Sequence, residues 1–239
     1  MSQSEFFAKP PRRGRIVVAV ITGLVLVAAG ITVGVIVTGD DSSQTETASP
    51  GSSASPSAST DGAESSLPIV AGEDTEAGVG VGYPHSKVGA VSAAVEFTSQ
   101  VLSTLDPDRA VEVAEVANDP DNGFDPADAA NTVTAMREQM GLPPTGDVPE
   151  GASIVTAPVA YQLRDETTDS MVVLLLCYVT KDTGSGEPQE DVGVFTMPMA
   201  WNGDDWKLVR SDDDTDYTDL NTTPGSDEAR AKGWIGVTR

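Results

Sequence analysis

The chain has 239 residues, with 37 acidic and 14 basic side chains and a formal net charge of −23 at pH 7. Residues 1–15 are net basic, so the remainder is strongly acidic and repels nucleic-acid phosphates, which argues against direct DNA or RNA binding. With aromatic residues at only 5%, this length suits about one domain with a modest core, plus non-globular segments.

An apolar segment without charges occupies residues 16–38, directly after the basic tail at 1–15. Its 23 residues would span ~34 Å as a helix, which is enough to cross a bilayer. Because basic residues precede the segment and Asp40 and Asp41 follow it, the positive-inside rule places the tail in the cytoplasm. A cleaved signal peptide is the alternative, but its apolar region is shorter and ends at a small-residue cleavage site. We therefore expect an uncleaved, single-pass anchor in the cell membrane.

The segment from 39 to 82 is rich in serine and glycine. Its first part, up to residue 66, contains no large apolar side chain and cannot form a core, so we expect a disordered tether over 39–82. The stretch 67–82 has enough apolar residues to dock partly on the domain. The folded, extracytoplasmic domain is expected over 83–239.

Three helices are predicted in the first half of this domain. Ser86 is a candidate N-cap for a helix over 87–105, in which apolar residues recur at steps of three and four. Asp106 and Asp125 each precede a proline. An N-cap residue followed by proline in the first turn is typical of a helix start, so two further helices are expected to begin at these positions.

Strands are predicted in the second half. In SIVTAPVAYQLR, alternation places five residues on one face, and Pro158 indicates a strand edge or a bulge. These five are Val155, Ala157, Val159, Tyr161 and Leu163. The run MVVLLLCYV is continuously apolar, which is typical of a central strand covered on both faces.

Asn202 and Gly203, between apolar segments, predict a tight hairpin that closes a meander of four strands. The predicted fold class is therefore α+β, with three helices packed on one face of a curved four-stranded antiparallel sheet. Trp234, near the end of the chain, is expected to pack back onto this domain.

This layout, with WNGDDWKLV at 201–209 closing the last hairpin, resembles the NTF2-like superfamily of cone-shaped α+β domains. A basic tail, a membrane helix and a tether before such a domain are similar to the bitopic assembly factors of type IV secretion and conjugation systems. YPHSKVGAVSAAVEF at 83–97 is similar to actinobacterial single-pass envelope proteins linked with conjugative elements. The acidic charge and the long tether depart from the assembly factors, and a shared fold does not transfer function.

His85 is the only histidine and Cys177 the only cysteine. His85 is either a general base beside an Asp or Ser, or a residue that only leads into the first helix. Because no second histidine and no G-x-S-x-G motif accompany it, we predict no catalytic residue and no enzyme. Cys177 lies in an apolar run without a local cation and is expected to be a buried core residue.

DPDNGFDPAD, at 119–128, invites a calcium interpretation through four carboxylates. These are Asp119, Asp121, Asp125 and Asp128. The calcium-loop pattern fails because Gly123 falls one position early, so a turn with an N-cap is preferred and we predict no metal site. The acidic stretch 211–219 is typical of a solvated surface.

An NTF2-like cone would place its pocket between the sheet and the helices. Six side chains are candidates to line such a pocket, or otherwise to fill the core: Met136, Met140, Tyr161, Tyr178, Met197 and Met199. Methionine fills irregular gaps in cores and tyrosine buries its ring, so the core interpretation is preferred and no cofactor is expected.

We therefore expect a membrane-anchored protein-interaction or assembly module, in a conjugation or secretion apparatus. Its partners would be envelope proteins or a second copy, since Gly30 and Gly34 permit close contact of membrane helices. The first alternative is a ligand-binding or enzymatic cone, which requires an enclosed, polar-lined cavity. The second is a sensor of cell-wall material, which requires an exposed cluster of Trp201, Trp206 and Trp234.

Overall fold

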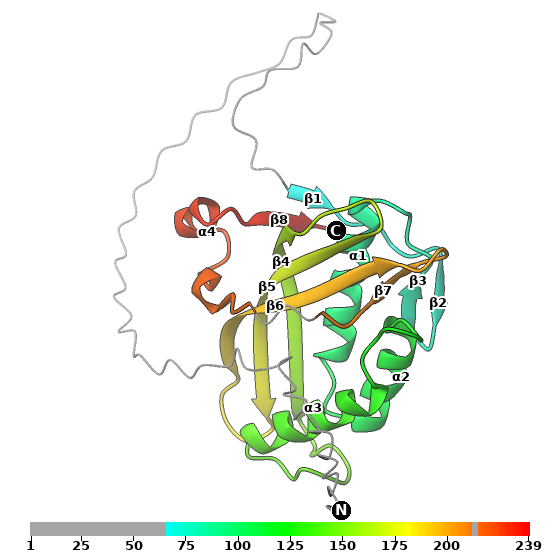
Figure 1. Ribbon diagram of the computed structural model, residues 1–239. Helices are drawn as coiled ribbons and strands as arrows, with labels where there is room; N and C mark the ends of the chain where they lie inside the picture. The colour runs from blue at the N-terminus through cyan, green and yellow to red at the C-terminus, as the bar shows by residue number, and fades with distance from the viewer. Residues whose placement is uncertain (1–65, 212–214) are drawn as a thin grey trace, which may run out of the picture.

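The computed structural model describes residues 66–211 and 215–239, which form a mixed α+β fold (Figure 1). The predicted basic tail, the predicted membrane helix at 16–38 and the tether up to residue 65 lie outside the described residues. Within the described ranges, no helix combines the length and the apolar character that a membrane crossing requires.

Along the chain, three short strands come first, three helices follow, then four strands, and a short helical segment precedes the last strand. The helices are α1 (Lys87–Val101), α2 (Pro107–Ala117), α3 (Pro126–Gln139), the 3-10 turn η1 (Thr218–Leu220) and α4 (Asp227–Ala231). The strands are β1 (Ser66–Pro68), β2 (Asp74–Glu76), β3 (Val79–Val81), β4 (Ala152–Arg164), β5 (Ser170–Thr183), β6 (Gln189–Trp201), β7 (Trp206–Leu208) and β8 (Ile235–Thr238).

The described strands form a six-stranded sheet in the order β1-β8-β4-β5-β6-β7 and a separate pair, β2-β3. The prediction of an NTF2-like domain with three helices on a four-stranded antiparallel sheet is therefore wrong. The meander β4–β7 is extended by β8 from the end of the chain and by β1, which runs parallel to β8. The folded part also begins before Tyr83, because β1, β2 and β3 lie in the segment assigned to the tether.

The predicted N-caps are confirmed at all three long helices. The Ser86 hydroxyl accepts from the Gly89 N–H at 3.1 Å, and the carboxylates of Asp106 and Asp125 accept from the first-turn N–H groups of α2 and α3. Helix α1 ends at Val101 rather than at residue 105. The chain leaves the helix there and bonds to β4, where the Thr156 N–H donates to the Ser103 hydroxyl at 2.8 Å.

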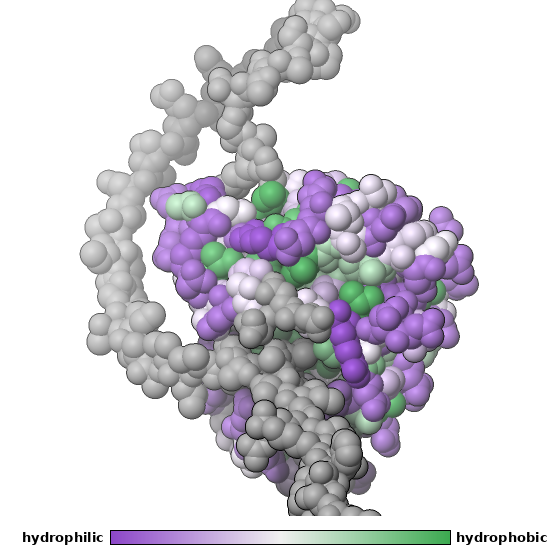
Figure 2. Space-filling model, viewed as in Figure 1, coloured by the Kyte–Doolittle hydropathy of each residue, from purple (hydrophilic) through white to green (hydrophobic). Residues whose placement is uncertain are grey.

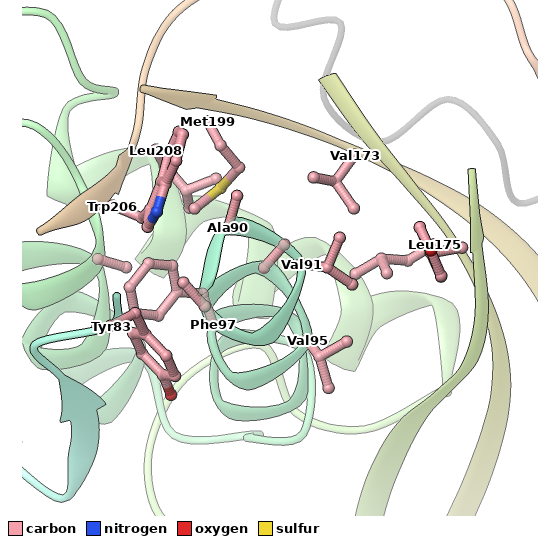
Figure 3. Packing of buried hydrophobic residues seen from close by; sticks show 14 of the residues in the cluster. Tyr83, Ala90, Val91, Val95, Phe97, Val173, Leu175, Met199, Trp206 and Leu208 are labelled. Atoms are coloured by element: carbon pink, nitrogen blue, oxygen red, sulfur yellow. The ribbon is translucent and has the colours of Figure 1, made fainter. Parts of the chain in front are cut away.

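One face of the sheet is covered by α1. Figure 3 shows Val91 and Val95 of α1 directed toward Val173 and Leu175 of β5. These four side chains are at most 1% exposed, and Phe97, on the same helix, is fully buried. The space between the sheet and the helices is therefore filled by apolar side chains.

The other face of β5 is covered by the C-terminal part of the chain. Leu174 and Leu176 are fully buried in a cluster with Ala229 of α4 and with Trp234. Trp234 also donates from Nε1 to the Leu220 carbonyl at 3.0 Å, which fixes the ring over the sheet. The prediction that β5 is a central strand covered on both faces is confirmed, as is the docking of Trp234, and helical segments flank both faces rather than one.

A shift in register follows Pro158 in β4, which confirms the bulge predicted there. Before the shift, Ala157 pairs with Tyr178, and after it Tyr161 pairs with Leu175. Because Tyr178 and Leu175 point to opposite faces of β5, Ala157 and Tyr161 do so as well. The prediction that one face carries both residues was wrong, because the extra residue of the bulge reverses the alternation.

Replacing Trp234 with Ala tests the second layer. The change removes the largest side chain over this face, so we expect a loss of about 3–5 kcal/mol in the free energy of unfolding. The free energy of unfolding is measured by urea titration of the full-length chain in detergent, with circular dichroism as the signal. Val70→Ala is the control, since Val70 is 40% exposed. Equal losses for the two variants would contradict the burial of Trp234.

Candidate functional site

The segment 83–86, between β3 and α1, meets the loops of two hairpins. His85 Nε2 lies 2.8 Å from Asp169 Oδ1 and 3.1 Å from the Thr168 carbonyl, both in the loop between β4 and β5. The imidazole also stacks on Trp201 at the end of β6, with ring centroids 4.3 Å apart and an interplanar angle of 11°. His85 therefore leads into α1 and also joins that helix to the sheet.

Asp205 is the buried centre of this region. Its Oδ1 accepts from the N–H groups of Tyr83 and Trp206, each at 2.9 Å, and its Oδ2 lies 3.4 Å from Lys207 Nζ. The Trp206 indole N–H donates to the Pro84 carbonyl at 3.0 Å. The predicted hairpin between β6 and β7 is confirmed, and its acidic turn holds the start of α1 against the sheet.

A shallow depression of about 390 Å³ opens to solvent beside His85. Its lining residues are His85, Ser86, Lys87, Glu166, Thr167, Thr168 and Met171. Lys87 Nζ lies 2.7 Å from Glu166 Oε1, and this hydrogen bond raises the pKa of the lysine. The lysine therefore remains a cation and is unsuited to act as a base or a nucleophile.

Three side chains with nucleophilic groups, Ser86, Cys177 and Tyr161, are engaged in a cap or buried. The Ser86 hydroxyl caps α1, and burial raises the pKa of the Cys177 thiol and of the Tyr161 phenol. A thiolate or phenolate is the nucleophilic form, and burial disfavours that form in both groups. Asp169 and His85 form an acid–imidazole pair at the depression, and the same imidazole joins α1 to the sheet.

Two of the four acidic side chains considered for calcium accept hydrogen bonds from the local backbone. Asp119 Oδ1 accepts from the N–H groups of Asp121 and Asn122, and Asp125 caps α3. Within the described ranges, no group of three or more His, Cys, Asp or Glu side chains has a metal-binding arrangement.

The candidate cavity residues have different surroundings. Tyr161 and Met199 are buried in the main core at 5% and 1% exposure, while Met136, Met140 and Met197 are half-buried against the core clusters. These five belong to the core, as preferred. Tyr178 does not, because it lies on the opposite face of the sheet and is 40% exposed.

Tyr178 belongs to an apolar area that the sequence analysis missed. Val155 of β4 is 52% exposed. Two residues farther along β4, Ala157 pairs with Tyr178 of β5, and on its other side Tyr178 pairs with Val192 of β6. These four residues, the outer-sheet patch, lie on the face that Trp234 covers farther along β5, and half-buried Val192 packs against the edge of that cover. Pro158 was the available signal, because a bulge there turns Val155 and Ala157 outward.

The tryptophans do not form an exposed cluster. Trp206 and Trp234 are 0% and 6% exposed, and only Trp201 is half-buried, beneath His85. This arrangement does not meet the requirement stated for a cell-wall sensor.

The chain matches the family model described as a domain of unknown function, DUF8175, over residues 38–228. Because the match covers most of the sequence, the chain belongs to this family. The search of curated proteins and the search of solved structures each returned no match.

Asp205→Ala tests the junction at the start of α1. The change leaves the N–H groups of Tyr83 and Trp206 without their acceptor, so we expect a loss of about 2–4 kcal/mol in unfolding free energy. The measurement is again urea unfolding. Asp204→Ala, at the exposed neighbouring position, is the matched control and should change stability by less than about 0.5 kcal/mol. A similar effect of both changes would contradict the role given to Asp205.

Cys177 provides a separate test of the core. Because the thiol is fully buried and its pKa is raised, we expect maleimide to modify the folded chain about a hundredfold or more slowly than the urea-unfolded chain at pH 8. Mass spectrometry of the single cysteine gives both rates directly. Equal rates in the two states would show that the thiol is accessible.

Proposed function

We propose that this protein is a membrane-anchored interaction module that presents its folded domain outside the cell membrane and acts without catalysis. The outer-sheet patch is the observation that carries the proposal. Two of its members, Val155 and Tyr178, are among the four large apolar residues that are exposed in the described ranges. Apolar side chains gathered on one exposed surface are typical of contact sites between proteins, whereas isolated ones are ordinary.

The interior supports binding at the surface rather than inside the domain. The volume between α1 and the sheet is filled by buried residues of the main core, and the depression at His85 is open to solvent. Ligand-binding domains hold small molecules in concave sites that bury most of the ligand. A solid core with an apolar outer strip therefore favours a protein partner over a small ligand.

Figure 2 shows mainly hydrophilic residues on the uncovered part of the face seen in Figure 1, with smaller hydrophobic groups between them. A domain tethered to a membrane meets membrane partners at a raised effective concentration, so a small contact area suffices for association. Assembly of an envelope apparatus for secretion or conjugation is the role that we propose for such contacts.

The test is site-specific crosslinking in intact cells. The photoreactive amino acid p-benzoylphenylalanine replaces Tyr178 in the full-length chain, and the products are identified by mass spectrometry. We expect a discrete crosslinked species at this position, because a bound partner covers the patch. The matched control carries the same amino acid in place of Glu115, which is exposed on α2.

Equal crosslinking at the two positions would mean that the patch has no partner, and the proposed function would then be wrong. A species formed only from position 178 supports it.

A further inference from the structure

We propose that the outer-sheet patch binds a segment of another protein in which an apolar side chain is flanked by lysine or arginine. This inference rests on the proposed function and adds the chemistry of the partner. It follows from the way the partner must approach the sheet, from the charges around the patch and from the groups that the patch presents.

Several backbone groups on the strand edges beside the patch cannot pair with an added strand. On β4, the Thr156 N–H is bonded to Ser103, and Pro158 has no N–H to offer. On β6, the side-chain amide of Asn221 donates to the Val192 carbonyl at 3.0 Å. An added strand would need these backbone groups, so the partner contacts the side chains on the face of the sheet.

Acidic side chains border the apolar residues on this face. Two and four residues after Tyr178 on β5, Thr180 pairs with Glu190 of β6 and Asp182 pairs with Ser153 of β4. Both acids therefore lie next to the patch along the strand direction. Their faces are set by the alternation along β5, because Tyr178, Thr180 and Asp182 point the same way. The patch therefore has carboxylates at one end.

Two lysines in this part of the domain are already paired with acids of the same chain. Lys181 points to the other face and lies 2.7 Å from Asp191. Lys232, beside the C-terminal layer, donates to the carbonyls of Asp219 and Asn221 and pairs with Glu228 at 2.9 Å. Asp182 Oδ1 accepts from the Gly184 N–H at 2.8 Å, but among the described residues neither Asp182 nor Glu190 pairs with a cation, so both carboxylates can attract one from outside.

The charge of the chain favours some binding partners of the patch over others. A chain with 37 acidic and 14 basic side chains repels a second copy of itself and anionic lipid, and it attracts a basic segment. The exposed ring of Tyr178 suits the same partner, because a tyrosine face attracts an ammonium or guanidinium group, and tyrosine is enriched among residues that dominate interfaces. Val155 and Ala157 supply the apolar contact.

The experiment reads the sequence of the bound segment. Crosslinks from p-benzoylphenylalanine in place of Val155 are formed in membranes that contain the full-length chain, and the attached peptide is sequenced by mass spectrometry. We expect a peptide from another protein with lysine or arginine beside an apolar residue. We also expect Glu190→Lys to reduce the crosslink yield about fivefold or more, because a like charge then faces the partner.

Two variants serve as controls. Glu115→Lys makes the same charge change on α2 and should leave the yield unchanged. Glu190→Gln removes the charge without reversing it and should give an intermediate yield, and urea unfolding of each variant verifies that the fold is kept.

The outcomes separate the two proposals. A crosslinked peptide that is acidic, or that comes from a second copy of this chain, overturns the basic-partner inference while the interaction function stands. A basic peptide whose yield is the same for Glu190→Lys and the unaltered chain also overturns it. No crosslink above that from position 115 overturns both.

Discussion

Strand β5 needs apolar cover on both of its faces, and the rest of the domain is arranged around that need. Every side chain from Met171 to Cys177 is buried, so a single layer of helices would leave half of them in water. Each buried leucine or valine contributes about 1.5–3 kcal/mol relative to exposure. Helix α1 covers one face, and the segment that contains Ala229 and Trp234 covers the other.

Local signals in the sequence predicted the elements but not how the sheet is completed. The caps at Ser86, Asp106 and Asp125 and the turn after Asn202 depend on neighbouring residues, so they were readable. Strand β1 has three residues and pairs with β8 at the other end of the chain, and no local pattern encodes that pairing. The apolar run of β5 did indicate a second layer, which conflicts with helices on one face only.

The contacts at the candidate site show the same limit. Asp205 binds the Tyr83 backbone across a separation of 122 residues, and His85 meets Thr168 across 83. The residue types were visible in the sequence, but their partners depend on the packing of α1 against the hairpins. The outer-sheet patch depends on a single inserted residue, because the bulge after Pro158 puts Val155 on the face opposite to buried Tyr161.

The cover over the second face of β5 has a consequence for the order in which the domain is made. The meander β4–β7 consists of neighbours in sequence, whereas Trp234 and β8 emerge from the ribosome after them. Until these last residues arrive, Leu174 and Leu176 have no cover, and a nascent chain exposes the apolar centre of its sheet. Such surfaces are the ones that chaperones bind and that aggregate when synthesis stalls. The domain is thus most vulnerable when it is nearly complete.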